Sequence, residues 1–153
     1  MTRAAIAEAR AFESWHNYQA ALTRAIAPLS SAQLQRQLLP GLRTPGEIAE
    51  HIVFGRALHL HRTLGEWAAE LGPLLRWENA GDPPHTVAEI VQGLERTWQF
   101  ITECLMRESP ADAVPEEEVS VVQTIWGLLD HDLPHAGELS LLLGAAGLPG
   151  VEI

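Results

Sequence analysis

Two histidines stand four residues apart in the run 128–143, which reads LLDHDLPHAGELSLLL and is otherwise rich in leucine. Because four residues make about one turn of an α-helix, His131 and His135 should point in the same direction. Two imidazoles at this spacing are a recurrent way of supplying two nitrogen ligands to one metal, although a single HxxxH pattern is a weak signal. The pair therefore suggests a metal site that needs a further ligand.

A third histidine, His51, lies on the same side of a predicted helix as Ile48 and Ile52 and should face the core. Taken alone, a histidine on an apolar face is usually a hydrogen-bonded core residue. Together with His131 and His135 it makes three neutral nitrogen ligands, which suit zinc, nickel, copper or iron(II). Three protein ligands leave coordination positions open, which is typical of a reactive metal site and not of a structural one.

Glu138 is the candidate catalytic residue, because it lies three residues beyond His135 and seven beyond His131 and so shares their helix face. As a proton carrier it would act on a substrate at the metal. The same position also suits a fourth metal ligand or an acceptor for a histidine N–H, and the alternative is a solvated carboxylate near a helix end. Asp132 and His16 are the other candidates for a proton carrier.

Four helical segments are predicted to position these side chains. Proline and glycine cluster at residues 40–41, 72–73, 81–84 and 110–115 and divide the chain into pieces of helical length. Apolar periodicity predicts helices over about 4–27, 44–65, 86–107 and 121–144. An all-α four-helix bundle, with a long crossover between the second and third helices, is the architecture that this pattern favours.

Side-chain caps indicate where these helices begin. The segments Thr44-Pro-Gly-Glu47 and Thr86-Val-Ala-Glu89 each place a glutamate three residues after a threonine, which is the signature of a capping box. The segment 120–123, SVVQ, is a weaker version, and the segment 30–33, SSAQ, is expected to cap one short turn.

Pro134 interrupts the predicted fourth helix between its two histidines. A proline in a helix interior lacks the backbone N–H and crowds the carbonyl of Asp130, at a cost of roughly 3 kcal/mol or more. We expect a helix that bends at this point but continues and keeps His131 and His135 together. The alternative is a helix that ends at Leu133 and restarts at Pro134, which would disrupt the metal site.

Length and composition indicate a soluble globular protein. The 153 residues predict one domain spanning 1–153, with a core large enough to need no disulfide. The net charge of −10 disfavours nucleic acid as a partner, since phosphate binding depends on lysine and arginine. No apolar run is long enough to cross a bilayer and the first residues do not read as a signal peptide, so a cytoplasmic location without membrane contact is expected.

The run 126–144, WGLLDHDLPHAGELSLLLG, together with the segment TPGEIAEHI at 44–52, resembles the DinB-like (YfiT-like) superfamily of metal-dependent enzymes over essentially the whole chain. The resemblance implies a four-helix bundle in which His51, His131 and His135 bind one divalent transition metal. Zinc or nickel is favoured, with iron or manganese as alternatives. Relatives often carry histidine where this chain has Gly127 and Pro134, but all three expected ligands are present.

The resemblance also implies an activity. Some members transfer low-molecular-weight thiols such as bacillithiol or mycothiol, with a metal that lowers the pKa of the thiol and presents the thiolate to a small electrophile. A metal-dependent hydrolase would use the same open site, and a non-catalytic, stress-induced metal- or ligand-binding protein is the third alternative. Since relatives are commonly dimers and the end of the fourth helix is rich in leucine, a homodimer acting on a small-molecule substrate is expected.

Overall fold

The computed structural model describes residues 3–107 and 121–152, and its regular secondary structure over these residues is entirely helical. The elements are α1 (Arg3–Ile26), α2 (Ser31–Leu34), α3 (Pro45–Leu64), the 3-10 segment η1 (Gly65–Arg76), α4 (Val87–Arg107) and α5 (Val121–Ala145). The all-α prediction is confirmed for the described residues, and the four long helices closely match the predicted segments. The expected break at 110–115 and the expected cap at Ser120 lie outside these residues.

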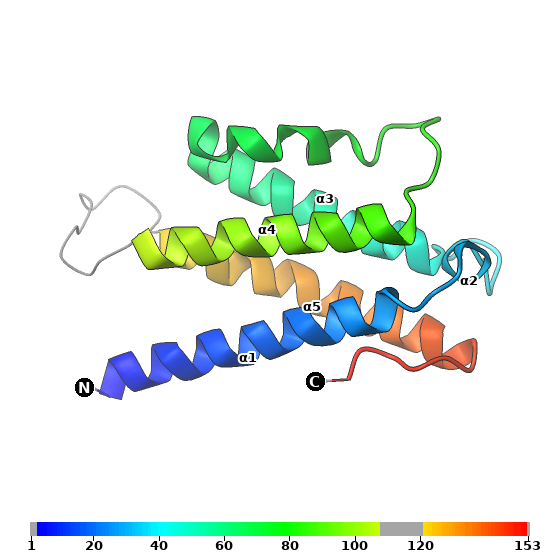
Figure 1. The fold of residues 1–153 in the computed structure, drawn as a ribbon, viewed down its shortest axis with the longest axis horizontal. Helices are drawn as coiled ribbons and strands as arrows, with labels where there is room; N and C mark the ends of the chain where they lie inside the picture. The colour runs from blue at the N-terminus through cyan, green and yellow to red at the C-terminus, as the bar shows by residue number, and fades with distance from the viewer. Residues whose placement is uncertain (1–2, 108–120, 153) are drawn as a thin grey trace.

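The long helices lie side by side in two directions. Figure 1 shows α1 and α5 running one way and α3 and α4 running the opposite way. The segment η1 runs back beside α3, so that α4 begins at the same end of the molecule as α3. Helix α3 packs against α4, α5 and η1, which makes it the element through which most of the structure is connected.

The predicted caps at the starts of α2, α3 and α4 are confirmed. The Thr44 hydroxyl accepts a hydrogen bond from the Glu47 N–H at 3.1 Å, and the Glu47 carboxylate accepts one from the Thr44 N–H at 2.6 Å. Thr86 and Glu89 make the same reciprocal pair, as do Ser30 and Gln33 at the four-residue helix α2. Each box satisfies backbone donors that a helix start would otherwise leave unpaired, which is why these helices begin where they do.

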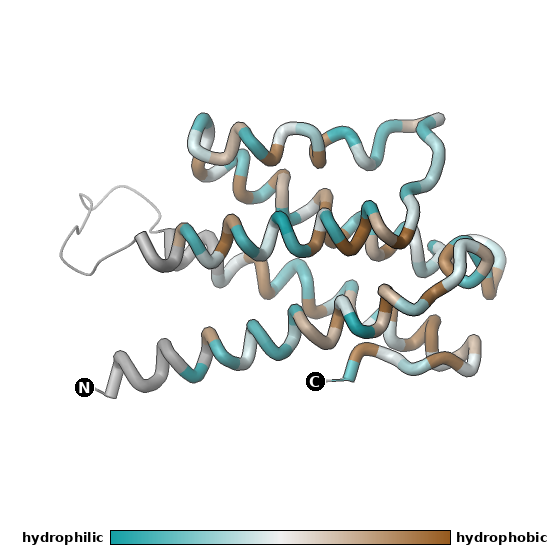
Figure 2. The backbone as a smooth tube through the Cα atoms, viewed as in Figure 1, coloured by the Kyte–Doolittle hydropathy of each residue, from teal (hydrophilic) through white to brown (hydrophobic). Residues whose placement is uncertain are grey.

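Apolar side chains from all four long helices form one buried core. Figure 2 shows apolar and polar residues alternating along each helix, as expected for helices with one buried side. The largest apolar side chains that are completely buried are Leu22, Ile26, Leu34, Ile48, Ile52, Leu60, Leu71, Ile90, Leu94 and Ile101. Among the described helices, none combines the length and the apolar character needed to cross a membrane.

Helix α5 continues through Pro134. It runs without interruption from Val121 to Ala145, so the alternative in which it ends at Leu133 and restarts is wrong. Pro134 and Asp130 are both exposed to solvent. The cost of the proline therefore falls on the outer backbone of α5, where water can reach the Asp130 carbonyl, and not on the packing of the core.

Replacing Pro134 with alanine should stabilise the metal-free protein. Proline is about 3 kcal/mol less favourable than alanine in a helix interior, so we expect the free energy of unfolding to rise by about 1–3 kcal/mol. Urea denaturation followed by circular dichroism measures this change. The matched control is Gly137→Ala, where an added β-carbon meets no atom within 4 Å and helix propensity alone should contribute about 0.5–1 kcal/mol. A gain for Pro134→Ala no larger than that of the control would contradict this account.

Candidate metal centre

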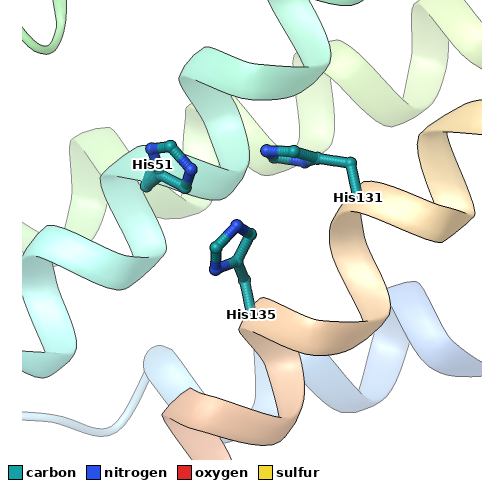
Figure 3. Close-up of side chains that lie close together, drawn as sticks. All are labelled: His51, His131 and His135. Atoms are coloured by element: carbon teal, nitrogen blue, oxygen red, sulfur yellow. The ribbon is translucent and has the colours of Figure 1, made fainter.

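The three predicted ligands come together between α3 and α5 (Figure 3). One ring nitrogen from each of His51, His131 and His135 can be chosen so that all lie within 4.8 Å of one another. The ring centroids are 5.2 Å apart for His51 and His131, 4.5 Å for His51 and His135, and 4.9 Å for His131 and His135. Since zinc–nitrogen bonds are about 2.0–2.1 Å long, a shared ion would draw the three nitrogens somewhat closer together.

The antiparallel packing of α3 and α5 explains why these residues meet. Positions four residues apart lie on one face of a helix, so a stripe at this spacing on α3 can face a stripe at the same spacing on α5. The facing pairs are His51 with His135, Gly55 with His131, and His59 with Gly127. The HxxxH spacing on α5 thus places one imidazole opposite His51 and the next opposite a glycine.

Gly55 makes room for the ring of His131. A β-carbon added at residue 55 would lie 2.5 Å from Nε2 of His131 and closer still to its Cε1, distances that real side chains do not adopt. Gly55 lies three residues after Ile52, so helix periodicity places it on the inward side of its helix but gives no reason for a glycine there. The absence of a side chain at this position lets His131 lie directly against the backbone of α3.

A carboxylate oxygen lies beside Nδ1 of each histidine. Metal-binding histidines commonly donate the N–H of the nitrogen that does not bind the metal to such an acceptor, which fixes the tautomer and makes the ligand nitrogen more basic. The contacts are His51 with Glu78, His131 with Asp132 Oδ1 at 3.4 Å, and His135 with Glu138 Oε2 at 3.3 Å. Because Nδ1 is engaged in all three rings, Nε2 is the nitrogen that each can offer to a metal.

Local electrostatics favour the neutral form of His135. Burial lowers its pKa, and the charges of His51, His131 and Arg43 lower it further, while the hydrogen bond to Glu138 opposes the shift. A histidine must be neutral to bind a metal. His135 therefore remains able to act as a ligand at a lower pH than an ordinary histidine would.

The three candidate proton carriers have different surroundings. Glu138 lies beside His135 at the edge of the cluster, with 38% of its side chain exposed, so a substrate could reach it. Asp132 is completely buried next to His131 and cannot exchange a proton directly with a bound substrate. His16 is exposed on α1, where its ring lies 6.1 Å from that of Trp98, and it is not part of the histidine cluster. The catalytic role of Glu138 stays a prediction.

Two residues at this site were not predicted from the sequence. Glu78 follows η1 in the chain and contacts His51, which lies 27 positions earlier, a pairing for which the local sequence carries no signal. Arg56 is completely buried and bonded to the carboxylate of Asp132. Arg56 could have been found, because it lies four residues after Ile52 and eight after Ile48 on a helix face that is otherwise apolar.

No protein-family model matches this chain, and no curated protein is found to be similar to it. The site itself combines three imidazoles that have carboxylate partners, a glycine that makes room for one of the rings, and a solvent-accessible edge at Glu138.

Replacing Gly55 with alanine should destabilise the protein through His131. Although alanine favours a helix, its β-carbon would overlap the imidazole, and overpacking of this kind typically costs about 1–3 kcal/mol. In a His131→Ala background the overlap is absent, so the same change should instead stabilise by up to about 1 kcal/mol. The difference between the two backgrounds, measured by urea denaturation, is the coupling free energy.

The control for this cycle is Gly127→Ala on the facing helix. A β-carbon there would lie 3.5 Å from Nε2 of His59, which is an ordinary contact, so little loss of stability is expected. Equal effects of Gly55→Ala in both backgrounds would show that His131 does not occupy the space at Gly55.

Proposed function

We propose that this chain is a divalent-metal-dependent enzyme of the DinB-like type, with His51, His131 and His135 as the ligands of one transition metal. The observation that carries the proposal is the convergence of three partly buried imidazoles from two helices, each with a carboxylate at Nδ1. In this proposal α1, α3, α4 and α5 are the four-helix bundle of such an enzyme, and residues 65–86 are its long crossover.

The donor set fits zinc or nickel best. Imidazole nitrogens suit both metals, and three of them leave room in the coordination sphere for a small molecule. About 30% of the His131 side chain and 38% of the Glu138 side chain are exposed, which supports access from solvent. Iron and manganese remain alternatives within the same proposal.

We propose transfer of a low-molecular-weight thiol to a small electrophile as the reaction. A metal held here would act as a Lewis acid and lower the pKa of a thiol at the open position. The chain's own contribution is to orient the three imidazoles through Glu78, Asp132 and Glu138. Glu138 also has the exposure needed to accept a proton from the incoming thiol or to return one to the product.

The proposal extends to a homodimer. Trp126, Leu133 and Leu141 are exposed on α5, with 43%, 49% and 73% of their surfaces accessible. Large apolar side chains on one helix favour association with a second copy of the chain.

Untagged protein should bind one divalent metal per chain, and replacing any of the three histidines with alanine should lower the metal content. Elemental analysis measures the stoichiometry, and circular dichroism should show that the helical signal is largely retained. His16→Ala is the control, because His16 is exposed and lies outside the cluster. Affinity should also fall on acidification, since protons compete with the metal for the imidazole nitrogens. Full stoichiometry in the triple alanine variant would place the metal elsewhere.

Metal-loaded protein should consume a small electrophile only when a low-molecular-weight thiol is present. Glu138→Gln should retain the metal but slow this reaction by about 10²–10⁴-fold if Glu138 carries the proton. His131→Ala should abolish it together with metal binding. Turnover without thiol would instead favour the hydrolase, and stoichiometric metal without turnover of either kind would favour the non-catalytic binding protein.

A further inference from the structure

A buried arginine connects the four long helices at the level of the histidine cluster. Arg56 on α3 has no solvent exposure, and its Nε donates a hydrogen bond to Asp132 Oδ2 on α5 at 2.6 Å. Its Nη1 donates to Gln19 Oε1 on α1 at 2.7 Å and lies 3.5 Å from Thr97 Oγ1 on α4. Nη2 is also 2.6 Å from Asp132 Oδ2. The guanidinium therefore fixes the position of one oxygen of the Asp132 carboxylate.

The other oxygen of Asp132 faces the histidine cluster. Asp132 Oδ1 lies 3.4 Å from Nδ1 of His131, while the backbone carbonyl of Asp132 accepts a hydrogen bond from the Tyr18 hydroxyl at 3.4 Å. Burial, and to a lesser degree the nearby Asp132 carboxylate, raises the pKa of Tyr18, so the phenol stays protonated and remains a donor. Arg56 thus holds the Asp132 carboxylate, with its other oxygen directed at His131, while the Tyr18 hydroxyl contacts only the backbone carbonyl of Asp132.

We propose that Asp132, clamped by Arg56, is a positioning residue that keeps the proton of His131 on Nδ1 and so presents Nε2 as a metal ligand. This inference rests on the proposed metal site. The carboxylates beside the other two histidines differ in kind, because Glu78 and Glu138 are 37% and 38% exposed while Asp132 is fully buried. A buried, clamped carboxylate has little freedom to turn away, so it holds its histidine in one tautomer more firmly than a solvated carboxylate can.

The competing explanation is that Arg56 and Asp132 only stabilise the fold. The energetics of buried ion pairs allow the positioning role and the structural role to be tested separately. Replacing both members of such a pair with apolar side chains of similar size is often neutral or stabilising. The double variant Arg56→Met/Asp132→Leu should therefore stay folded while His131 loses its acceptor. If the pair only holds the helices together, the folded double variant should keep the metal affinity of the unmodified protein.

The first experiment measures zinc affinity by competition with a chromogenic chelator, with stability measured by urea denaturation. We expect the folded double variant to bind zinc about 10–100-fold more weakly than the unmodified protein. Tyr18→Phe is the matched control, because it removes the contact to the Asp132 backbone but leaves both carboxylate oxygens in place, and its zinc affinity should be close to that of the unmodified protein. A folded double variant with unchanged affinity would overturn the proposal.

The second experiment needs no metal and covers the case in which the double variant fails to fold. In Asp132→Asn, Arg56 can only donate, so it should hold the amide oxygen and turn the amide NH₂ toward His131. His131 Nδ1 must then accept, and the ring proton should move to Nε2. Nitrogen-15 chemical shifts of the His131 ring in chelator-treated protein report the tautomer at a pH where the ring is neutral.

We expect the Nδ1–H tautomer in the unmodified protein and the Nε2–H tautomer in Asp132→Asn. The same tautomer in both proteins would overturn the proposal. The tautomer is measured without zinc, so this experiment tests the role of Asp132 separately from the proposed function. If the unmodified protein binds no metal, the proposed function fails, while the tautomer result still decides whether Asp132 positions His131.

Discussion

The buried ion pair between Arg56 and Asp132 joins α3 to α5 one position along each helix from Gly55 and His131, and so lies at the level of the histidine cluster. Gly55 immediately precedes Arg56, and His131 immediately precedes Asp132. Where Arg56 bonds to Asp132, Gly55 and His131 therefore also lie face to face. One turn away on each helix, His51 and His135 then meet. Removing only one member of a buried pair leaves an uncompensated charge and typically costs about 3–5 kcal/mol, so a packing of α3 against α5 that separates Arg56 from Asp132 is strongly disfavoured.

The helices could be predicted because their signals are local. Thr44 and Glu47 lie three residues apart, and the geometry of one turn is enough to make them cap each other. The HxxxH spacing is local too, so His131 and His135 could be paired from the sequence. His51 could be added because the residues around it mark the buried side of its helix. These features need no knowledge of how the chain folds back on itself.

The remaining parts of the site depend on contacts between distant segments. Glu78 reaches His51 only because η1 runs back along α3, and no short-range pattern encodes that path. The role of Gly55 depends on the ring of His131, which comes from α5. The neighbouring contact between Arg56 and Asp132 likewise joins residues 76 positions apart. Arg56 can be recognised in the sequence as a charged residue on an apolar helix face. Its partner Asp132 can be identified only from the packing of α3 against α5.

Pro134 is tolerated because it lies on the solvent-exposed side of α5, away from the side that carries the histidines. The inner side of α5 carries the two histidines and the buried Asp132, while Pro134 and Asp130 are on the exposed side. The missing backbone hydrogen bond therefore lies where water can replace it, and the clamp on Asp132 holds the inner side in place. The three imidazoles are then supported unequally: His131 by a fixed, buried carboxylate, and His51 and His135 by partly exposed ones that are freer to move. In the proposed metal site, His131 would therefore be the ligand that is oriented before binding, and His51 and His135 would be the rings that are free to adjust.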